Sequence, residues 1–131
     1  QLDGVRCIAD YEGNLQTRTG KPFSFMEGIK TQIKKLNMRK GMYLDGELYV
    51  EGLSFENLCS ITKQTKKRSA QEDILEFHVF DIFDIENLTE PFEERHKRIG
   101  GLKLKLPLKE VETKKTQKDF ETQHISKQKH S

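Results

Sequence analysis

The stretch at residues 44–52, Leu-Asp-Gly-Glu-Leu-Tyr-Val-Glu-Gly, constrains the fold more than any other part of the chain. Side chains alternate between the two faces of a β-strand, so this spacing predicts one apolar face and one acidic face. The apolar face, which belongs on a hydrophobic core, consists of Leu44, Leu48 and Val50. The acidic face consists of Asp45, Glu47, Tyr49 and Glu51. Like charges repel, so this face is either solvated, the commoner fate of Asp and Glu, or meets a cation or a basic partner.

Composition excludes several classes of protein. A chain of 131 residues fits one domain with a real core. The formal net charge is only +2, so net charge gives no argument for nucleic-acid binding. No apolar run approaches the length of a membrane span, and no signal peptide opens the chain. Cys7 and Cys59 lack disulfide-framework spacing, which favours free buried thiols in a reducing, intracellular compartment. The four histidines are scattered, and we assign them no metal.

The first half of the chain predicts a hairpin and two helices around the central strand. Residues 7–18 read as two short strands joined by a turn. Ser24 followed by Glu27 is a capping-box pattern, which opens a helix whose apolar residues recur at helical spacing. Gly41 is placed to end that helix, and Ser54 is placed to cap a second, shorter one.

The second half predicts two more strands and another helix. Residues 75–83 are rich in Phe, Val and Ile and predict a strand buried on both faces. A helix is expected over about residues 92–99, ended by a pair of glycines. The alternating leucines of residues 102–108 predict a half-buried strand near a sheet edge. Residues 63–69 form a basic loop, for which a solvated surface is a more common role than phosphate contact.

The sum of these elements is an α+β domain with a mainly antiparallel sheet and packed helices. We expect residues 1–108 to form this domain. Residues 109–131 are expected to be a polar C-terminal segment that is weakly helical or disordered. No feature of the sequence indicates an oligomeric state.

Four segments together resemble the nucleotidyltransferase (adenylation) domain of the ATP-dependent DNA ligases. They are Gln-Leu-Asp-Gly-Val-Arg at residues 1–6, Thr-Arg-Thr-Gly at 17–20, Leu-Asp-Gly-Glu at 44–47 and Phe-His-Val-Phe-Asp-Ile at 77–82. They occur in the family's order over about residues 1–99. The resemblance implies the ligase and capping-enzyme nucleotidyltransferase fold, which is ATP-grasp-like, in truncated form. Residues 1–108 would then be a partial adenylation domain.

The resemblance also implies an activity. The family seals nicks in double-stranded DNA, in replication or repair, through a lysyl-adenylate and a DNA-adenylate. ATP and Mg²⁺ would be the cofactors, and nicked double-stranded DNA would be the partner, with no membrane. Phosphoryl chemistry of this kind depends mainly on positioning and charge neutralisation, which explains arginines and a carboxylate in the motifs.

Roles for individual residues follow from the same resemblance. Arg6 would contact the ribose or a nearby phosphate, and Phe80 would stack on the adenine. Glu47 would bind the ribose or Mg²⁺. Arg18 would hold the 5′-phosphate of the nick, because a planar, permanently charged fork suits an oxyanion. Without the resemblance, two hairpin arginines, a solvated carboxylate and a core phenylalanine would be the ordinary interpretation.

The sequence departs from the family at two points. Gln1 occupies the position of the nucleophilic lysine, and a carboxamide nitrogen is not a competent nucleophile because its lone pair is delocalised. We therefore expect this chain alone to form no lysyl-adenylate. Residues 100–131 match neither the family's Glu-Gly strand nor its Lys-x-Lys strand, which indicates a truncated domain.

Three interpretations remain open. The chain is part of an ATP-dependent DNA ligase, a degenerate homologue that binds a nucleotide or a nick without catalysis, or an RNA ligase or capping-type nucleotidyltransferase. The Thr-Arg-Thr-Gly element and the aromatic strand favour a DNA ligase over the third class. The first interpretation is the one we prefer for function, although Gln1 favours the second.

Overall fold

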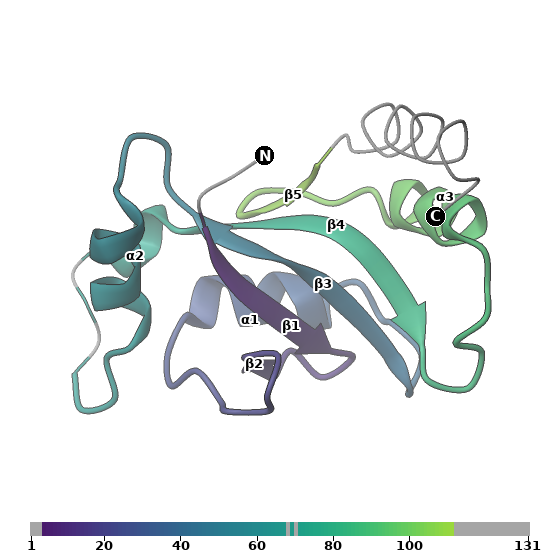
Figure 1. Ribbon diagram of the computed structural model, residues 1–131, viewed down its shortest axis with the longest axis horizontal. Helices are drawn as coiled ribbons and strands as arrows, with labels where there is room; N and C mark the ends of the chain where they lie inside the picture. The colour runs from purple at the N-terminus through teal and green to yellow at the C-terminus, as the bar shows by residue number, and fades with distance from the viewer. Residues whose placement is uncertain (1–3, 68, 70, 112–131) are drawn as a thin grey trace, which may run out of the picture.

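The computed structural model describes residues 4–67, 69 and 71–111. In chain order the elements are β1 (Val5–Asp10), β2 (Leu15–Gln16), α1 (Glu27–Lys34), β3 (Met42–Tyr49), α2 (Phe55–Thr62), the 3₁₀ turn η1 (Glu72–Ile74), β4 (Glu76–Asp84), α3 (Phe92–Leu102) and β5 (Leu108–Glu110) (Figure 1). The α+β class is confirmed. Among these residues, no helix has both the length and the apolar character of a membrane span.

The sheet has the strand order β2-β1-β3-β4-β5, and only the pair β4–β5 is parallel. The expected mainly antiparallel sheet is therefore confirmed. The expected division of the chain into two parts at residue 108 stays a prediction. The last strand of the sheet, β5, ends at Glu110. The expected weak helix after that point falls in residues 112–131, outside the described part of the chain.

Strand β3 lies at the centre of the sheet and alternates as its sequence predicts. Every second residue from Met42 to Leu48 is buried, and the residues between them are half-buried on the other face. The strand ends at Tyr49, however, so the extension to residue 52 was wrong. Leu53 donates a backbone hydrogen bond of 3.1 Å to the carbonyl of Val50, and the resulting turn places Glu51 off the sheet.

The hydrophobic core lies between the apolar face of the sheet and the helices. Ile29 and Ile33 of α1 are buried against it, and α1 lies behind the sheet in Figure 1. Helix α2 contributes Leu58 and Ile61, and its N-cap is the predicted one, since Asn57 N–H donates to Ser54 Oγ at 3.1 Å. Phe55 has the same helical spacing as Leu58 and Ile61 but is 53 % exposed, so the apolar face of α2 is shorter than its sequence predicts.

A β-bulge in β4 leaves one aromatic residue without a partner on β3. Asp45 lies opposite Asp81 and the next residue, Gly46, lies opposite Val79, so Phe80 is the extra residue. A Cβ on Gly46 would lie 2.1 Å from the carbonyl oxygen of His78. Only glycine permits this close approach of the two strands.

The capping box predicted before α1 was wrong. The helix begins at Glu27, and its N-cap is Met26 in the left-handed conformation (φ 75°), without a side-chain hydrogen bond. Phe23 and Met26 are both buried, so packing of these side chains sets the entry to the helix rather than Ser24. Gly41 does have positive φ (96°), but it turns the chain into β3, because the helix has already ended.

The end of the described chain also differs from expectation. Helix α3 continues through both glycines to Leu102 and ends at Lys103 in the left-handed conformation. It lies beside the second half of β4 (Figure 1), so only the first half is open for pairing. Strand β5 accordingly contains three residues and pairs with Phe77–Val79. The alternating leucines therefore do not form one strand. Burial of β4 on both faces was also wrong, because Phe80 and Phe83 are half-buried.

Candidate functional site

The face of the sheet that carries Asp45 and Glu47, which we call the polar face, also carries a basic residue. Arg6 of β1 lies opposite Glu47 of β3 in the register. Its guanidinium donates two hydrogen bonds to Asp45, from Nε to Oδ1 at 2.7 Å and from Nη2 to Oδ2 at 2.6 Å. The cation that the acidic face of β3 meets is thus an arginine of the neighbouring strand, held as a bidentate fork.

One edge of Arg6 is fixed and the other is open. The hydrogen bond to Asp45 is the main cause that raises the pKa of Arg6 above its ordinary value, so the guanidinium is permanently charged. Its side chain is 37 % exposed. The Nη1 group makes no hydrogen bond with a described residue. Arg6 can therefore donate to an oxygen of a ligand without releasing Asp45.

Phe80 lies on this same face and not in the core. The Cζ atom of Arg6 lies 5.1 Å from the centre of the Phe80 ring, a cation–π contact. Phe80 is the extra residue of the bulge, and its ring is half-buried. A ring in this position can stack on a planar base.

Glu47 contacts the backbone that precedes β1. The N–H of Gly4 donates to Glu47 Oε1 at 3.2 Å. A Cβ at position 4 would lie 2.6 Å from the carbonyl oxygen of Leu48 and 3.0 Å from Glu47 Oε1, which explains the glycine. Oε2 of Glu47 makes no hydrogen bond with a described residue. One carboxylate oxygen therefore positions the chain, and the other is available to a ligand.

His78 is a residue that the sequence reasoning missed. It lies opposite Glu47 in the register and is only 6 % exposed. Its Nε2 lies 2.8 Å from Glu76 Oε1, and its ring meets Tyr49 edge-on with centroids 5.2 Å apart. Alternation of residues 76, 78 and 80 could have placed His78 beside Phe80 on the polar face. The assumption of a fully buried strand hid that signal.

The structure does not bring every predicted residue to this face. Arg18 is exposed in the turn after β2, which is closed by a hydrogen bond of 3.0 Å from Gly20 N–H to the Thr17 carbonyl. Arg18 makes no ion pair with another described residue. Gln1 lies outside the described residues. The assembled group is thus Arg6, Glu47 and Phe80, with Arg18 apart.

The polar face fits a metal ion only in a limited sense. Within the described ranges, no three His, Cys, Asp or Glu residues gather closely enough to hold one. Asp45 is occupied by Arg6, and Asp81 accepts from Arg95 Nε at 2.8 Å. Mg²⁺ is often bound through one or two carboxylates together with substrate phosphates and water. Glu47 fits that kind of site, whereas a cage built from protein ligands does not fit.

Comparisons with known proteins agree with the fold. No family model and no curated protein matches the sequence. The solved structure Pmar-Lig_Pre. matches with a TM-score of 0.67 and 21 % identity, over 86 % of this chain and 29 % of that chain. A Lig E DNA ligase matches with a TM-score of 0.65 and 21 % identity, over 85 % and 41 %.

A third match is the ATP-dependent DNA ligase of bacteriophage T7 in complex with ATP, with a TM-score of 0.51 and 19 % identity, over 78 % of this chain and 42 % of the ligase. The chain has the fold of part of a DNA-ligase nucleotidyltransferase domain. It spans less than half the length of each of these three chains. The predicted resemblance is confirmed as a likeness of fold.

Proposed function

We propose that this chain is the nucleotide-binding part of an ATP-dependent DNA ligase, and that it binds ATP on the polar face of its sheet. One observation carries the proposal. Arg6, Glu47 and Phe80 come from three different strands, yet they lie on one face around the β4 bulge. A positive group, a carboxylate oxygen and an aromatic ring are the groups that recognise a phosphate, a ribose and a base.

Each residue has a definite task in this proposal. Phe80 stacks on the adenine, and the contact with Arg6 already orients the Phe80 ring. Arg6 donates from Nη1 to a ribose or phosphate oxygen, because Asp45 holds its other edge in place. Glu47 accepts from a ribose hydroxyl or ligates Mg²⁺, whose remaining ligands would be nucleotide phosphates and water. When bound, Mg²⁺ would neutralise charge on those phosphates.

Arg18 is proposed to bind the 5′-phosphate of a nick in double-stranded DNA. Its support is the exposed, unpaired guanidinium in a turn closed by hydrogen bonds. Substituting Arg18→Ala is expected to weaken binding to a 5′-phosphorylated nicked duplex more than binding to the intact duplex. Equal losses on both duplexes, measured by fluorescence anisotropy, would assign Arg18 a general phosphate contact at most.

The nucleophile needs separate treatment. Transfer of AMP to the protein requires a lysine amine that attacks the α-phosphorus of ATP and displaces pyrophosphate. Gln1 occupies that position in the sequence, and its amide nitrogen cannot perform the attack. A second candidate function, binding of a nucleotide or a nick without catalysis, is favoured by this one residue.

The direct test is ATP affinity measured by isothermal titration calorimetry. Stacking of a base on an aromatic ring contributes about 1–3 kcal/mol, so Phe80→Ala should weaken ATP binding by about tenfold or more. Phe55→Ala is the matched control, since Phe55 lies 53 % exposed on α2, away from the polar face. Equal affinity of Phe80→Ala and the unaltered chain, or no ATP binding by either, contradicts the proposal.

The two candidate functions separate in an adenylation assay with labelled ATP. The unaltered chain is expected to take up no covalent label. A stable label on the Gln1→Lys variant would indicate a ligase pocket that lacks only its nucleophile. ATP binding without any label on that variant would favour the non-catalytic function.

A further inference from the structure

Five basic residues form what we call the basic rim: Arg18, Lys21, Lys63, Lys66 and Lys67. They belong to two segments, residues 17–21 and 63–67, that contain no acidic residue. All five are exposed. The second segment is the basic loop after α2, for which the proposed ATP site provides no role.

The two segments meet in space although more than forty positions separate them. A hollow of about 200 Å³ lies between them. Its lining includes Thr17, Lys21, Ser24, Thr62, Lys63 and Thr65. The floor of the hollow is largely apolar, with Val5, Pro22 and Phe23 among its lining. Lys21 and Lys63 border it from the two segments, and the other three cations of the basic rim are their neighbours along the chain.

The basic rim has no internal neutralisation. Among the described residues, none of its five cations forms an ion pair. By contrast, Arg6, Arg39, Arg95 and Arg98 are each paired with a carboxylate. The net charge of the chain is only +2, so the positive rim reflects segregation of charge and not a generally basic protein.

The basic rim also lies close to the proposed ATP site along the chain. Val5 lines the hollow, and its neighbour Gly4 donates to Glu47. Val5 has the parity of the buried Cys7 and Ala9, so the hollow and the polar face flank the start of β1 from opposite sides.

We infer that Lys63, Lys66 and Lys67 extend the phosphate-binding surface of Arg18 and hold the sugar–phosphate backbone of duplex DNA beyond the nick. This inference depends on the proposed function, which supplies DNA as the partner. Backbone contacts of this kind position a duplex without reading its sequence. Binding through them releases counterions, so it weakens steeply with salt.

The test compares two triple variants in anisotropy titrations with a 5′-phosphorylated nicked duplex across a range of salt. The first is Lys63→Gln, Lys66→Gln and Lys67→Gln. The matched control is Lys34→Gln, Lys35→Gln and Lys40→Gln, three exposed lysines that lie outside both segments of the basic rim. Circular dichroism confirms that both variants fold.

The loop variant should lower the slope of log affinity against log salt by about 2 to 3, at ~0.9 per phosphate contact. Between 50 and 200 mM salt the unaltered chain should therefore lose about 40-fold more affinity than the loop variant. The control should keep the slope of the unaltered chain.

Other outcomes have distinct meanings. Equal losses from the loop variant and the control would overturn the inference in favour of a diffuse charge effect. An unchanged loop variant, with Arg18→Ala still weakening nick binding, would overturn the inference and leave the proposed function standing. No binding of the unaltered chain to nicked DNA even at low salt would overturn the DNA part of the proposed function, and this inference with it.

Discussion

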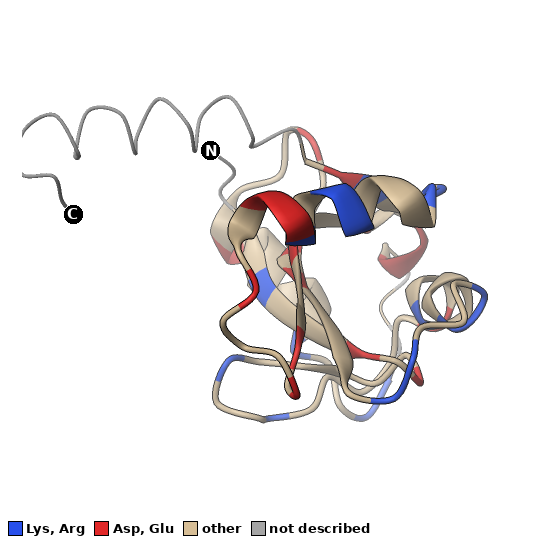
Figure 2. Cartoon of the chain, turned by 90° about the vertical axis from the view of Figure 1, so that its right-hand side faces the viewer, with Lys and Arg blue, Asp and Glu red and all other residues tan. Residues whose placement is uncertain are grey.

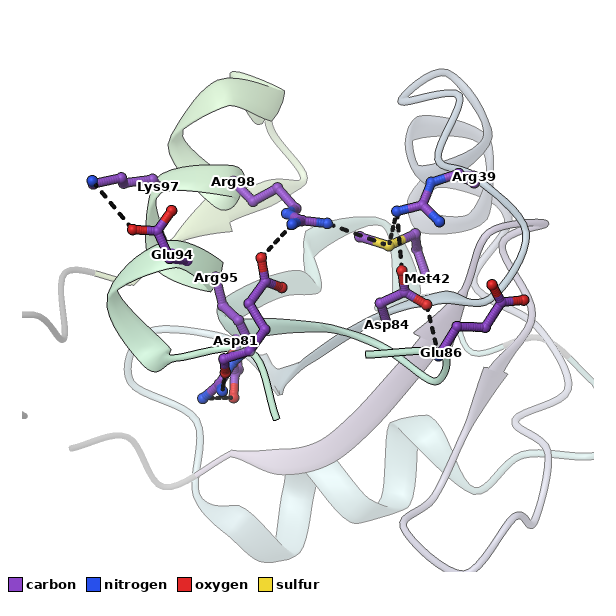
Figure 3. Close-up of polar contacts among 10 residues, drawn as sticks. Arg39, Met42, Asp81, Asp84, Glu86, Glu94, Arg95, Lys97 and Arg98 are labelled. Atoms are coloured by element: carbon purple, nitrogen blue, oxygen red, sulfur yellow. Dashed lines mark hydrogen bonds and ion pairs between the residues drawn. The ribbon is translucent and has the colours of Figure 1, made fainter. Parts of the chain in front are cut away.

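The arginines around β4 and the cations of the basic rim have the same charge in opposite surroundings. Arg95 lies 2.8 Å from Asp81, Arg39 lies 3.0 Å from Asp84, and Arg98 pairs with Glu90 (Figure 3). Figure 2 shows the same mixture along α3, where an acidic first turn is followed by basic residues. The basic rim has no such partners among the described residues.

The comparison separates structural cations from cations available to a ligand. Arg39 precedes β3 and Arg98 lies on α3, and both reach the sulfur of Met42, at 3.6 and 4.0 Å (Figure 3). They therefore connect α3 to the ends of the central strands. Pairing with a carboxylate neutralises the charge of a guanidinium and weakens its attraction for a second anion. Arg6 is paired in this way too, but its Nη1 group makes no hydrogen bond with a described residue. The predictions below test this division on one scale, the free energy of unfolding in urea.

The largest effect is expected for Asp45→Ala. It leaves the Arg6 guanidinium without its two hydrogen bonds on a half-buried face. Hydrogen bonds to charged groups contribute about 1.5–3 kcal/mol, so the free energy of unfolding should fall by about 2 kcal/mol. Asp45→Asn, which keeps one acceptor, should lose less. A loss below about 0.5 kcal/mol for the alanine variant would mean that the pair of Arg6 and Asp45 does not stabilise the fold.

Arg95→Ala should have the next largest effect. Its side chain is 21 % exposed, donates to both Asp81 and the Glu90 carbonyl, and lies over Phe92. We expect a loss of about 1–1.5 kcal/mol. The matched control is Lys97→Ala on the same helix, whose pair with Glu94 is exposed; it should lose no more than about 0.5 kcal/mol. Equal losses for the two variants would mean that the partial burial of the Arg95–Asp81 pair adds nothing to the free energy of unfolding.

Asp84 should make stability depend on acid pH. The N–H of Glu86 donates to Oδ1 at 2.8 Å, and together with Arg39 it lowers the pKa of this carboxyl below its ordinary value. The contribution is therefore complete above the unfolded pKa of about 3.9 and is lost as the pH falls through the lower folded pKa. Between pH 5 and pH 3 the unaltered chain should lose more stability than Asp84→Asn. Parallel losses would contradict this assignment.

The smallest effect is expected from the basic rim. Replacing Lys63, Lys66 and Lys67 with glutamine removes exposed cations that form no ion pair with a described residue. The free energy of unfolding should therefore change by less than about 0.5 kcal/mol. The same variant is expected to change DNA binding strongly. A marked loss of stability would show that these lysines have a structural role after all.

Local patterns in the sequence predicted the local parts of the fold. Alternation over β3 gave the correct two faces, because the period of a strand is set by the backbone alone. The cap at Ser54 was also correct. The capping box at Ser24 failed because burial of Met26 decided the start of α1. The leucine alternation before β5 failed because α3 lies beside the second half of β4.

The candidate site depended on information that no local pattern contains. Arg6 and Asp45 are 39 positions apart, and their pairing follows from the register between β1 and β3. The bulge that leaves Phe80 without a partner depends on the close approach of β4 to Gly46. Sequence resemblance predicted site roles for Arg6, Glu47 and Phe80, which the structure brings to one face. It did not indicate that Asp45 would hold one edge of Arg6.

The most direct test of the account is an NMR titration of the ¹⁵N-labelled chain, first with ATP and then with a nicked duplex. ATP should shift the amide signals around Gly4, Arg6, Glu47 and Phe80. The duplex should shift those of residues 17–21 and 63–67 and leave the paired arginines of α3 in place. Shifts from the duplex centred on α3, or from ATP spread outside the polar face, would contradict the division between structural and ligand-binding cations.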